Sequence, residues 1–173
     1  MTPPTDWLVQ HQDLLPIDGD ALDVACGRGR HAFWLAQRGL RVRALDRDAA
    51  AIDGIRREAQ RTGLHISAEV FDLERPGVSL GRDQFDVIVG VHYLHRALFP
   101  ALLDALRPDG LLIYETFTLA QAARGHPTNP DFLLRPGELR ALVAPLAVID
   151  YREGTCDGRD VAGIVAQRAP GQV

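Results

Sequence analysis

Apolar runs and amphipathic stretches alternate along most of the chain. Apolar runs predict five strands, at 21–25, 40–45, 65–71, 85–91 and 111–117. Apolar residues spaced three and four positions apart predict helices, at 6–15, 31–38, 48–61 and 97–106. Regular alternation of strands and helices is typical of a parallel sheet that carries helices on both faces. We therefore expect an α/β fold, a Rossmann-like three-layer sandwich.

The end of the chain departs from this alternation. A helix is predicted at 135–146, followed directly by two strands at 147–152 and 160–167. The seven residues between these two strands can form a hairpin, but they are too few for a crossover helix. The sheet is therefore expected to end with an antiparallel strand. At 173 residues, with no internal repeat or interdomain linker, the chain is expected to form one domain.

The segment from residue 21 to residue 46 carries the strongest functional signal. The first strand runs into a turn that contains Gly27 and Gly29, a helix follows, and the second strand ends at Asp46. This βαβ arrangement is typical of nucleotide-cofactor binding, because the glycines let the backbone turn sharply and approach a ligand. Asp46 lies 19 residues after Gly27, where a carboxylate can accept hydrogen bonds from both ribose hydroxyls.

Two classes of cofactor are compatible with this turn. Gly27-x-Gly29-x-x-Ala32 satisfies the dinucleotide fingerprint, so a small NAD(P)-dependent oxidoreductase is one interpretation. Against it, Asp23 stands at the tip of the first strand, where a dinucleotide fold normally has an apolar side chain. A carboxylate at this point would repel a pyrophosphate and attract an ammonium group. A chain of this length also leaves little room for a separate substrate domain.

The segment 22–29 resembles the first motif of the class I S-adenosylmethionine-dependent methyltransferases, with Ala25 in place of the family's first glycine. The string 26–31 is most similar to the tellurite-resistance-type branch, and 93–96 and 129–139 resemble uncharacterised bacterial small-molecule methyltransferases. The resemblance covers residues 18–168. It implies a mostly parallel seven-stranded sheet in the order 3-2-1-4-5-7-6, with S-adenosylmethionine as cofactor and S-adenosylhomocysteine as product.

The same resemblance implies a role for individual residues. The backbone from Ala25 to Gly27 would hold the methionine and ribose portion, and Asp46 would bind the ribose hydroxyls. Asp72 and Leu73 would contact the adenine. The full set expected to bind the cofactor is Asp23, Ala25, Cys26, Gly27, Gly29, Arg30, Asp46, Arg47, Asp72, Leu73 and Val91.

Candidate catalytic residues follow the fourth strand, at the edge where α/β sheets bind ligands. They are His92, Tyr93 and His95, and substrate contact, general-base catalysis and structural hydrogen bonding all remain open for them. The two histidines have metal-like spacing, but no recognisable pattern supplies further ligands, so no metal is expected. The irregular segment 118–134 is predicted to be an active-site lid.

Composition restricts the partners. A net charge of -4 and a sequence pI of about 5.8 disfavour a nucleic-acid substrate, and no apolar run is long enough to span a membrane. Two cysteines in separate motifs indicate a reducing, cytoplasmic environment. We therefore expect methyl transfer to a small-molecule nucleophile by in-line displacement, in a monomer or homodimer. A non-catalytic protein that binds S-adenosylmethionine is the other alternative.

Overall fold

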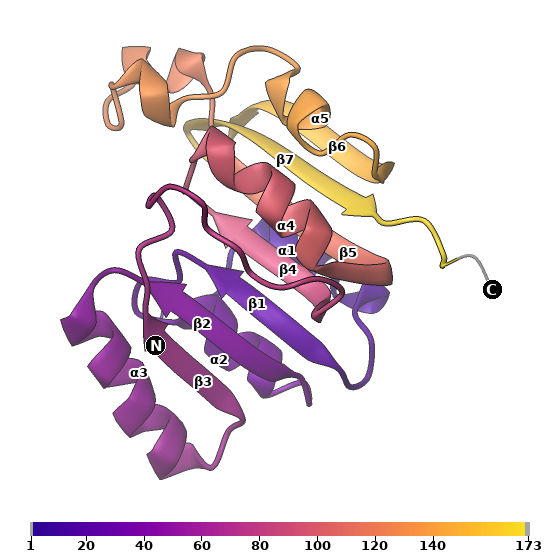
Figure 1. Cartoon of the computed structure of the whole chain (residues 1–173). Helices are drawn as coiled ribbons and strands as arrows, with labels where there is room; N and C mark the ends of the chain where they lie inside the picture. The colour runs from indigo at the N-terminus through magenta and orange to yellow at the C-terminus, as the bar shows by residue number, and fades with distance from the viewer. Residues whose placement is uncertain (1, 172–173) are drawn as a thin grey trace.

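A computed structural model describes residues 2–171, which form a single seven-stranded sheet with helices on both faces (Figure 1). The strands are β1 (Asp20–Val24), β2 (Arg41–Asp46), β3 (Ile66–Val70), β4 (Phe85–Val91), β5 (Leu106–Phe117), β6 (Ala147–Cys156) and β7 (Arg159–Gln167). They lie in the order β3-β2-β1-β4-β5-β7-β6. The first five are parallel, and β7 pairs antiparallel with both β5 and β6. The predicted fold class and strand order are confirmed.

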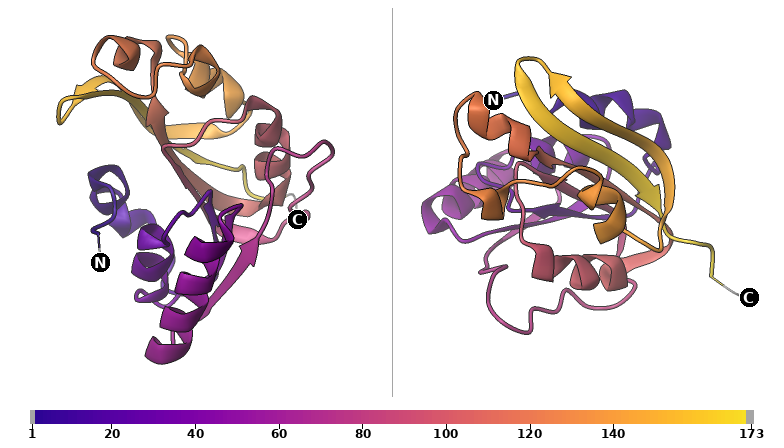
Figure 2. Two further views of the ribbon diagram at one scale, coloured as in Figure 1. Left: turned by 90° about the vertical axis from the view of Figure 1, so that its left-hand side faces the viewer. Right: turned by 90° about the horizontal axis from the view of Figure 1, so that it is seen from above.

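Two groups of helices cover the sheet. The α-helices are α1 (Asp6–Gln10), α2 (Arg30–Ala36), α3 (Ala49–Thr62), α4 (Phe99–Ala105) and α5 (Glu138–Leu142). The short 3-10 helices are η1 (Gln12–Leu14), η2 (Arg96–Leu98), η3 (Leu119–Ala123) and η4 (Pro130–Phe132). Figure 2 shows α1, α2 and α3 on one face and α4 and α5 on the other. Each face buries its own apolar cluster, around Leu35 and Ile52 on the first face and around Phe99 and Leu139 on the second.

Local sequence signals set the ends of α3. The Asp48 carboxylate accepts hydrogen bonds from the N–H groups of Ala50 and Ala51, at 2.9 and 3.1 Å, and so caps the start of the helix. Gly63 ends the helix with a φ of +69°, in the left-handed region that favours glycine. Both ends lie where the sequence predicts them.

Several predicted boundaries are wrong near the end of the chain. Helix α5 begins at Glu138, not at 135, because Gly137 takes a left-handed φ of +69° just before it. Strands β6 and β7 extend toward each other until only Asp157 and Gly158 separate them, with φ values of +49° and +75°. Two consecutive positive φ values are typical of a tight hairpin turn, which an Asp-Gly pair favours. The hairpin is therefore longer and its turn shorter than predicted.

The first predicted helix is also shorter than expected, since α1 ends at Gln10 and the 3-10 helix η1 follows. Trp7 nevertheless anchors this segment to the sheet: its indole lies directly against Gly163 of β7, where a Cβ would approach the ring within 2.8 Å. Among residues 2–171, no helix combines the length and the apolar character needed to cross a membrane.

Candidate functional site

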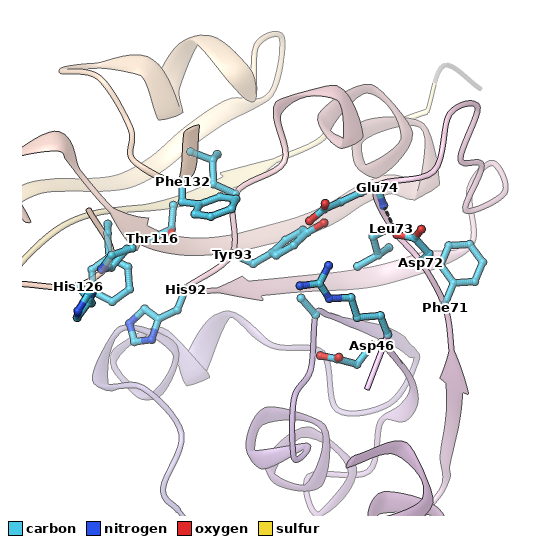
Figure 3. Close-up of a pocket in the computed structure, with 15 residues that line it drawn as sticks. Asp46, Phe71, Asp72, Leu73, Glu74, His92, Tyr93, Thr116, His126 and Phe132 are labelled. Atoms are coloured by element: carbon cyan, nitrogen blue, oxygen red, sulfur yellow. Dashed lines mark hydrogen bonds between the residues drawn. The ribbon is translucent and has the colours of Figure 1, made fainter. Parts of the chain in front are cut away.

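A cavity of about 600 Å³ opens at the edge of the sheet where the parallel strands end (Figure 3). Its two ends differ in chemistry. One, called here the carboxylate end, is lined by Asp46, Phe71, Asp72, Leu73 and Glu74. The other, the histidine end, is lined by His92, Thr116, Phe117, His126 and Phe132. Tyr93 lies between them, and Ala25, Arg47, Leu94 and Pro127 complete the lining.

Asp46 connects the glycine turn to the tip of β2. Its carboxylate accepts the N–H of Gly27 at 2.8 Å through one oxygen and the N–H of Asp48 at 2.9 Å through the other. Each carboxylate oxygen has a second lone pair, so both can still accept a hydrogen bond from a ligand. A Cβ on Gly27 would meet no atom within 4 Å, so there is open space beside the turn. The two Asp46 carboxylate oxygens, each able to accept a further hydrogen bond, therefore lie next to exposed backbone of the glycine turn.

The turn itself uses left-handed backbone at three alternate positions. Ala25, Gly27 and Gly29 have φ values of +50°, +53° and +80°. Gly29 also packs tightly, since a Cβ there would lie 2.9 Å from Ile55 of α3. Ala25 is the only one of the three with a side chain, and an L-residue in this region is strained by about 1 kcal/mol. The position where the sequence departs from its family motif is therefore a position that favours glycine.

The turn after β3 forms the rest of the carboxylate end. Asp72 accepts the N–H of Glu74 at 2.9 Å, which leaves its other oxygen free toward the cavity (Figure 3). Phe71 and Leu73 flank this carboxylate with apolar surface, and Leu73 is buried. A carboxylate between apolar walls suits a flat ring that carries an amino group.

Asp23 lies behind the turn and does not line the cavity. It is only 1% exposed, and its carboxylate accepts the N–H of Ala32 at 3.0 Å, in the first turn of α2. Burial raises the pKa of Asp23 to about 7. Cys26 is also buried, and burial together with Asp23 and Asp46 raises the pKa of its thiol, which disfavours the nucleophilic thiolate.

Four further sequence candidates lie around the cavity rather than in its lining. Gly27 and Gly29 form the turn, Arg30 begins α2, and Val91 ends β4 and packs toward the α2 face. The Arg30 guanidinium donates to the Pro3 carbonyl at 3.5 Å. Of the predicted cofactor set, the cavity brings together Ala25, Asp46, Arg47, Asp72 and Leu73.

His92 is the first residue after β4 and has a φ of +56°. Its ring stacks on Phe117, with centroids 4.5 Å apart and planes inclined by 22°. Burial, followed by the charges of Arg30 and Arg159, lowers the pKa of His92 to about 4, so the imidazole is neutral near pH 7. It can accept a hydrogen bond, but it is a weak base.

Tyr93 presents a buried hydroxyl that lies beside the Glu74 carboxylate (Figure 3). Burial and the carboxylates of Glu74 and Asp72 raise its pKa, so it stays protonated. The Tyr114 hydroxyl donates to the Tyr93 carbonyl at 2.8 Å and fixes the backbone here. A hydroxyl in the cavity wall, between the two ends, is placed to contact a ligand.

The structure separates His95 from the other two candidate catalytic residues. His95 does not line the cavity, and its carbonyl accepts the N–H of Leu98 at the start of η2. Within the described part of the chain, no group of histidine, cysteine or acidic side chains could hold a metal ion.

The predicted lid, 118–134, is fixed at both of its ends. Leu119 donates to the Leu134 carbonyl, and Leu133 and Leu134 are buried. The Arg124 guanidinium pairs with Asp160 at the start of β7. Only the stretch that includes His126, Pro127 and Phe132 reaches the cavity.

Sequence reasoning did not select several of the lining residues as site residues. They are Phe71, Glu74, Leu94, Thr116 and Phe117, together with His126, Pro127 and Phe132, which the sequence placed only as part of the predicted lid 118–134. The position of Thr116 and Phe117 at the end of a strand was an available signal, since every parallel strand ends at this edge. No local pattern distinguishes His126, which reaches the cavity only through the path of its loop.

The strand order and the glycine turn define a Rossmann-like fold, a class of fold in which nucleoside cofactors bind at the carboxyl edge of the sheet. A family model described as a methyltransferase domain matches residues 21–110, and the chain belongs to this family. The predicted class is thereby confirmed: the chain carries a methyltransferase domain.

Solved structures share the fold. An S-adenosylmethionine-dependent methyltransferase from Mesorhizobium loti is 18% identical, with a TM-score of 0.74, over 92% of this chain and 96% of its own. TehB from Haemophilus influenzae is 17% identical, with a TM-score of 0.76, over 94% of this chain and 61% of its own. A relative found by sequence, Hemagglutinin 1 from Eikenella corrodens, is 26% identical over 138 residues, which are 76% of this chain. The match spans only 45% of that relative's length.

Proposed function

We propose that the protein transfers the methyl group of S-adenosylmethionine to a small-molecule nucleophile by in-line displacement. One observation carries this proposal: a single cavity joins an acidic end beside the glycine turn to an aromatic end that holds a neutral imidazole. A cavity with two chemically different ends can hold two different ligands, the methyl donor and the methyl acceptor, in contact with each other. The cavity volume, about 600 Å³, lies in the range of small-molecule sites.

The residues at the carboxylate end fit the cofactor. Asp46 has free acceptor positions for the two ribose hydroxyls, and the open space beside Gly27 leaves room for the methionine portion against the backbone. Asp72 and Leu73 would hold the adenine, through a carboxylate and an apolar wall. When bound, S-adenosylmethionine supplies a methyl group on a positively charged sulfur, which is already an activated leaving group.

The remaining work of the chain is to position the acceptor and to exclude water. Phe117 and Phe132 provide apolar walls at the histidine end, and His92 offers a neutral nitrogen that can orient the acceptor. Tyr93, between the two ends, can donate a hydrogen bond to either ligand. His95 lies outside the cavity lining, so we place it outside the catalytic group.

Three further expectations belong to this proposal. The net charge of -4 supports a substrate other than a nucleic acid. A single domain over 1–173, in a monomer or homodimer, is sufficient for the reaction, because one sheet edge supplies both ends of the cavity. A cytoplasmic location remains a prediction from the two free cysteines, Cys26 and Cys156.

Ligand-dependent thermal unfolding tests the cofactor. S-adenosylmethionine and S-adenosylhomocysteine should raise the thermal midpoint, whereas oxidised and reduced nicotinamide dinucleotides should not. At a ligand concentration 100-fold above Kd the stabilisation is about 2.7 kcal/mol. A shift with the dinucleotides alone would support the oxidoreductase alternative instead.

Catalysis needs a separate assay. Release of S-adenosylhomocysteine should be measured against a panel of thiols, phenols, carboxylic acids and oxyanions of selenium and tellurium. Turnover with at least one of these compounds is expected. Cofactor binding without turnover across the panel would support the non-catalytic alternative.

A further inference from the structure

The charged side chains that line the cavity all belong to one of its ends. They come from the ends of β2 and β3 and are Asp46, Arg47, Asp72 and Glu74. The histidine end is lined by two imidazoles, a hydroxyl and two phenyl rings, and no carboxylate or guanidinium among the described residues lines it. A charged group that leaves water needs a partner of opposite charge. The histidine end therefore suits an uncharged ligand.

Phe132 is an exposed aromatic residue on a segment that is held in place. It is 49% exposed, and its ring points into the cavity, toward Tyr93 (Figure 3). The Arg96 guanidinium donates to the carbonyls of the two residues that flank it, Asp131 and Leu133, at 2.9 Å each. The same guanidinium donates twice to the Glu138 carboxylate, at 2.6 and 3.0 Å. Four hydrogen bonds from one side chain therefore fix the backbone that carries this phenyl ring.

The apolar walls of the histidine end are aromatic on two separate segments of the chain. Phe117 ends β5, and its ring already stacks on His92, with centroids 4.5 Å apart. On the following loop, Leu133 is buried whereas Phe132 lines the cavity. A ring packed against Phe132 would remove its exposed apolar surface from water, and aromatic rings pack well against one another. The two walls therefore favour a ligand with a flat aromatic ring.

The polar groups at this end can orient a hydroxyl or an amino group. The His92 imidazole is neutral near pH 7, because burial lowers its pKa to about 4. Thr116 and His126 line the same end. A hydroxyl and a neutral imidazole can each donate or accept a hydrogen bond, but neither neutralises a charge. The chemistry of these groups therefore agrees with that of the walls.

We propose that the methyl acceptor is an uncharged aromatic compound, with its ring packed against Phe132 and with a hydroxyl or amino group as the nucleophile. This inference rests on the proposed function and names the substrate class of the same site. The lone pair of the nucleophile forms the bond to the methyl carbon, and the carbon–sulfur bond of the donor breaks with its pair going to sulfur. The nucleophile then loses one proton, which the exposed His126 imidazole can take up and pass to water.

Ligand-observed NMR titrations of the protein saturated with S-adenosylhomocysteine test this proposal with three probes. Phenol, cyclohexanol and benzoate each contain a six-membered ring; cyclohexanol is not aromatic, and benzoate alone is charged near pH 7. Phenol should bind at least fivefold more tightly than either of the other two. Phe132→Leu should weaken phenol binding about fivefold and change cyclohexanol binding by less than twofold, because leucine keeps an apolar wall but removes the ring.

Two further variants make the test specific to the ring. Phe132→Tyr keeps an aromatic wall and should keep the phenol affinity within twofold of the parent. Leu119→Ala truncates an exposed side chain of η3 that does not line the cavity, and it should leave the affinities for all three probes unchanged. Each variant should bind S-adenosylhomocysteine as the parent does, because neither position belongs to the carboxylate end.

Turnover separates this proposal from the function on which it rests. In the assay of S-adenosylhomocysteine release, phenols and aromatic amines should be methylated, whereas carboxylic acids and oxyanions should not. Turnover of carboxylic acids or oxyanions alone would overturn the uncharged aromatic acceptor while the proposed function stands. Phenol binding no tighter than that of cyclohexanol or benzoate, or unchanged in Phe132→Leu, would overturn it in the same way. If the parent protein does not bind S-adenosylhomocysteine, the proposed function itself fails.

Discussion

The two ends of the cavity are built from the chain in different ways. The carboxylate end consists of Asp46, the last residue of β2, and of the residues that directly follow β3, so its side chains are placed by the ends of their own strands. The histidine end draws His92 from the turn after β4, Phe117 from β5, and His126 and Phe132 from the following loop. Local turns therefore place the residues proposed to bind the cofactor, whereas long-range packing places the residues proposed to bind the methyl acceptor.

Loss of the imidazole at the histidine end should have the largest effect. His92→Ala removes the stacking partner of Phe117 and the nitrogen that orients the acceptor, and turnover should fall on the order of 100-fold. Affinity for S-adenosylhomocysteine should stay within a few-fold of the parent. Steady-state kinetics and calorimetry measure the two quantities separately.

His92→Asn gives a second variant for this prediction, since asparagine tolerates the left-handed φ of +56°. The control His65→Ala changes an exposed histidine at the opposite edge of the sheet and should leave turnover unchanged. If both His92 variants keep full turnover, the histidine end is not where the acceptor reacts.

At the carboxylate end, Asp46→Ala should act on cofactor affinity instead. It removes a charged acceptor and also frees the N–H of Gly27, so binding of S-adenosylhomocysteine should weaken by roughly 1.5–3 kcal/mol. Turnover at saturating cofactor should change much less. Asp53→Ala, an exposed aspartate on α3, is the matched control. Unchanged affinity in calorimetry would show that the cofactor does not bind against Asp46.

Acid should destabilise the fold through His31, which supports the N-terminal segment. Burial lowers the pKa of His31 to about 3, below the value of about 6.5 expected in the unfolded chain. The contribution of neutral His31 to the free energy of unfolding is therefore complete above pH 6.5 and is lost as the pH falls toward 3. Between pH 7.5 and pH 5 the free energy of unfolding should decrease by about 2 kcal/mol from this group. Urea unfolding at the two pH values, with His31→Gln for comparison, measures it; an equal decrease in both proteins would contradict the assignment.

Asp23 should show the opposite sign. Its pKa is raised to about 7 in the folded protein, so the stability it supports is complete below the unfolded value and is lost as the pH rises through 7. Asp23→Asn removes a buried charge and keeps an oxygen that can accept the N–H of Ala32. Between pH 6 and pH 8 the parent without ligand should therefore lose about 1.4 kcal/mol of stability relative to the variant. Urea unfolding that shows a destabilised variant at pH 8 would mean that the carboxylate has a partner beyond Ala32.

The smallest expected effect lies in the glycine turn. Ala25→Gly relieves a side chain held at a φ of +50°, and the free energy of unfolding should rise by about 0.5 kcal/mol. Chemical denaturation with the parent as reference resolves a change of this size. Gly27→Ala, which introduces the same strain at φ +53°, should shift stability in the opposite direction.

The sequence by itself determined the alternation of strands and helices, the glycine turn, and the positions of Asp46, Asp72 and His92 at the ligand edge of the sheet, while the strand order followed from the resemblance to a known family. These are encoded locally: a run of apolar residues makes a buried strand, and the residue that ends a parallel strand lies at the same edge as the others. The sequence also predicted both ends of α3, because each end depends on one capping residue, Asp48 at the start and Gly63 at the end.

Only the tertiary structure decided which candidates face the cavity. Asp23 and His95 have the right spacing in the sequence, yet neither lines the cavity. Asp23 is buried behind the glycine turn, and His95 lies in the turn that precedes η2. His126 has no local signature and reaches the site because Arg124 and Leu134 fix the loop around it. Spacing along the chain fixes which strand end a side chain occupies, but its direction and its neighbours depend on contacts between segments far apart in sequence.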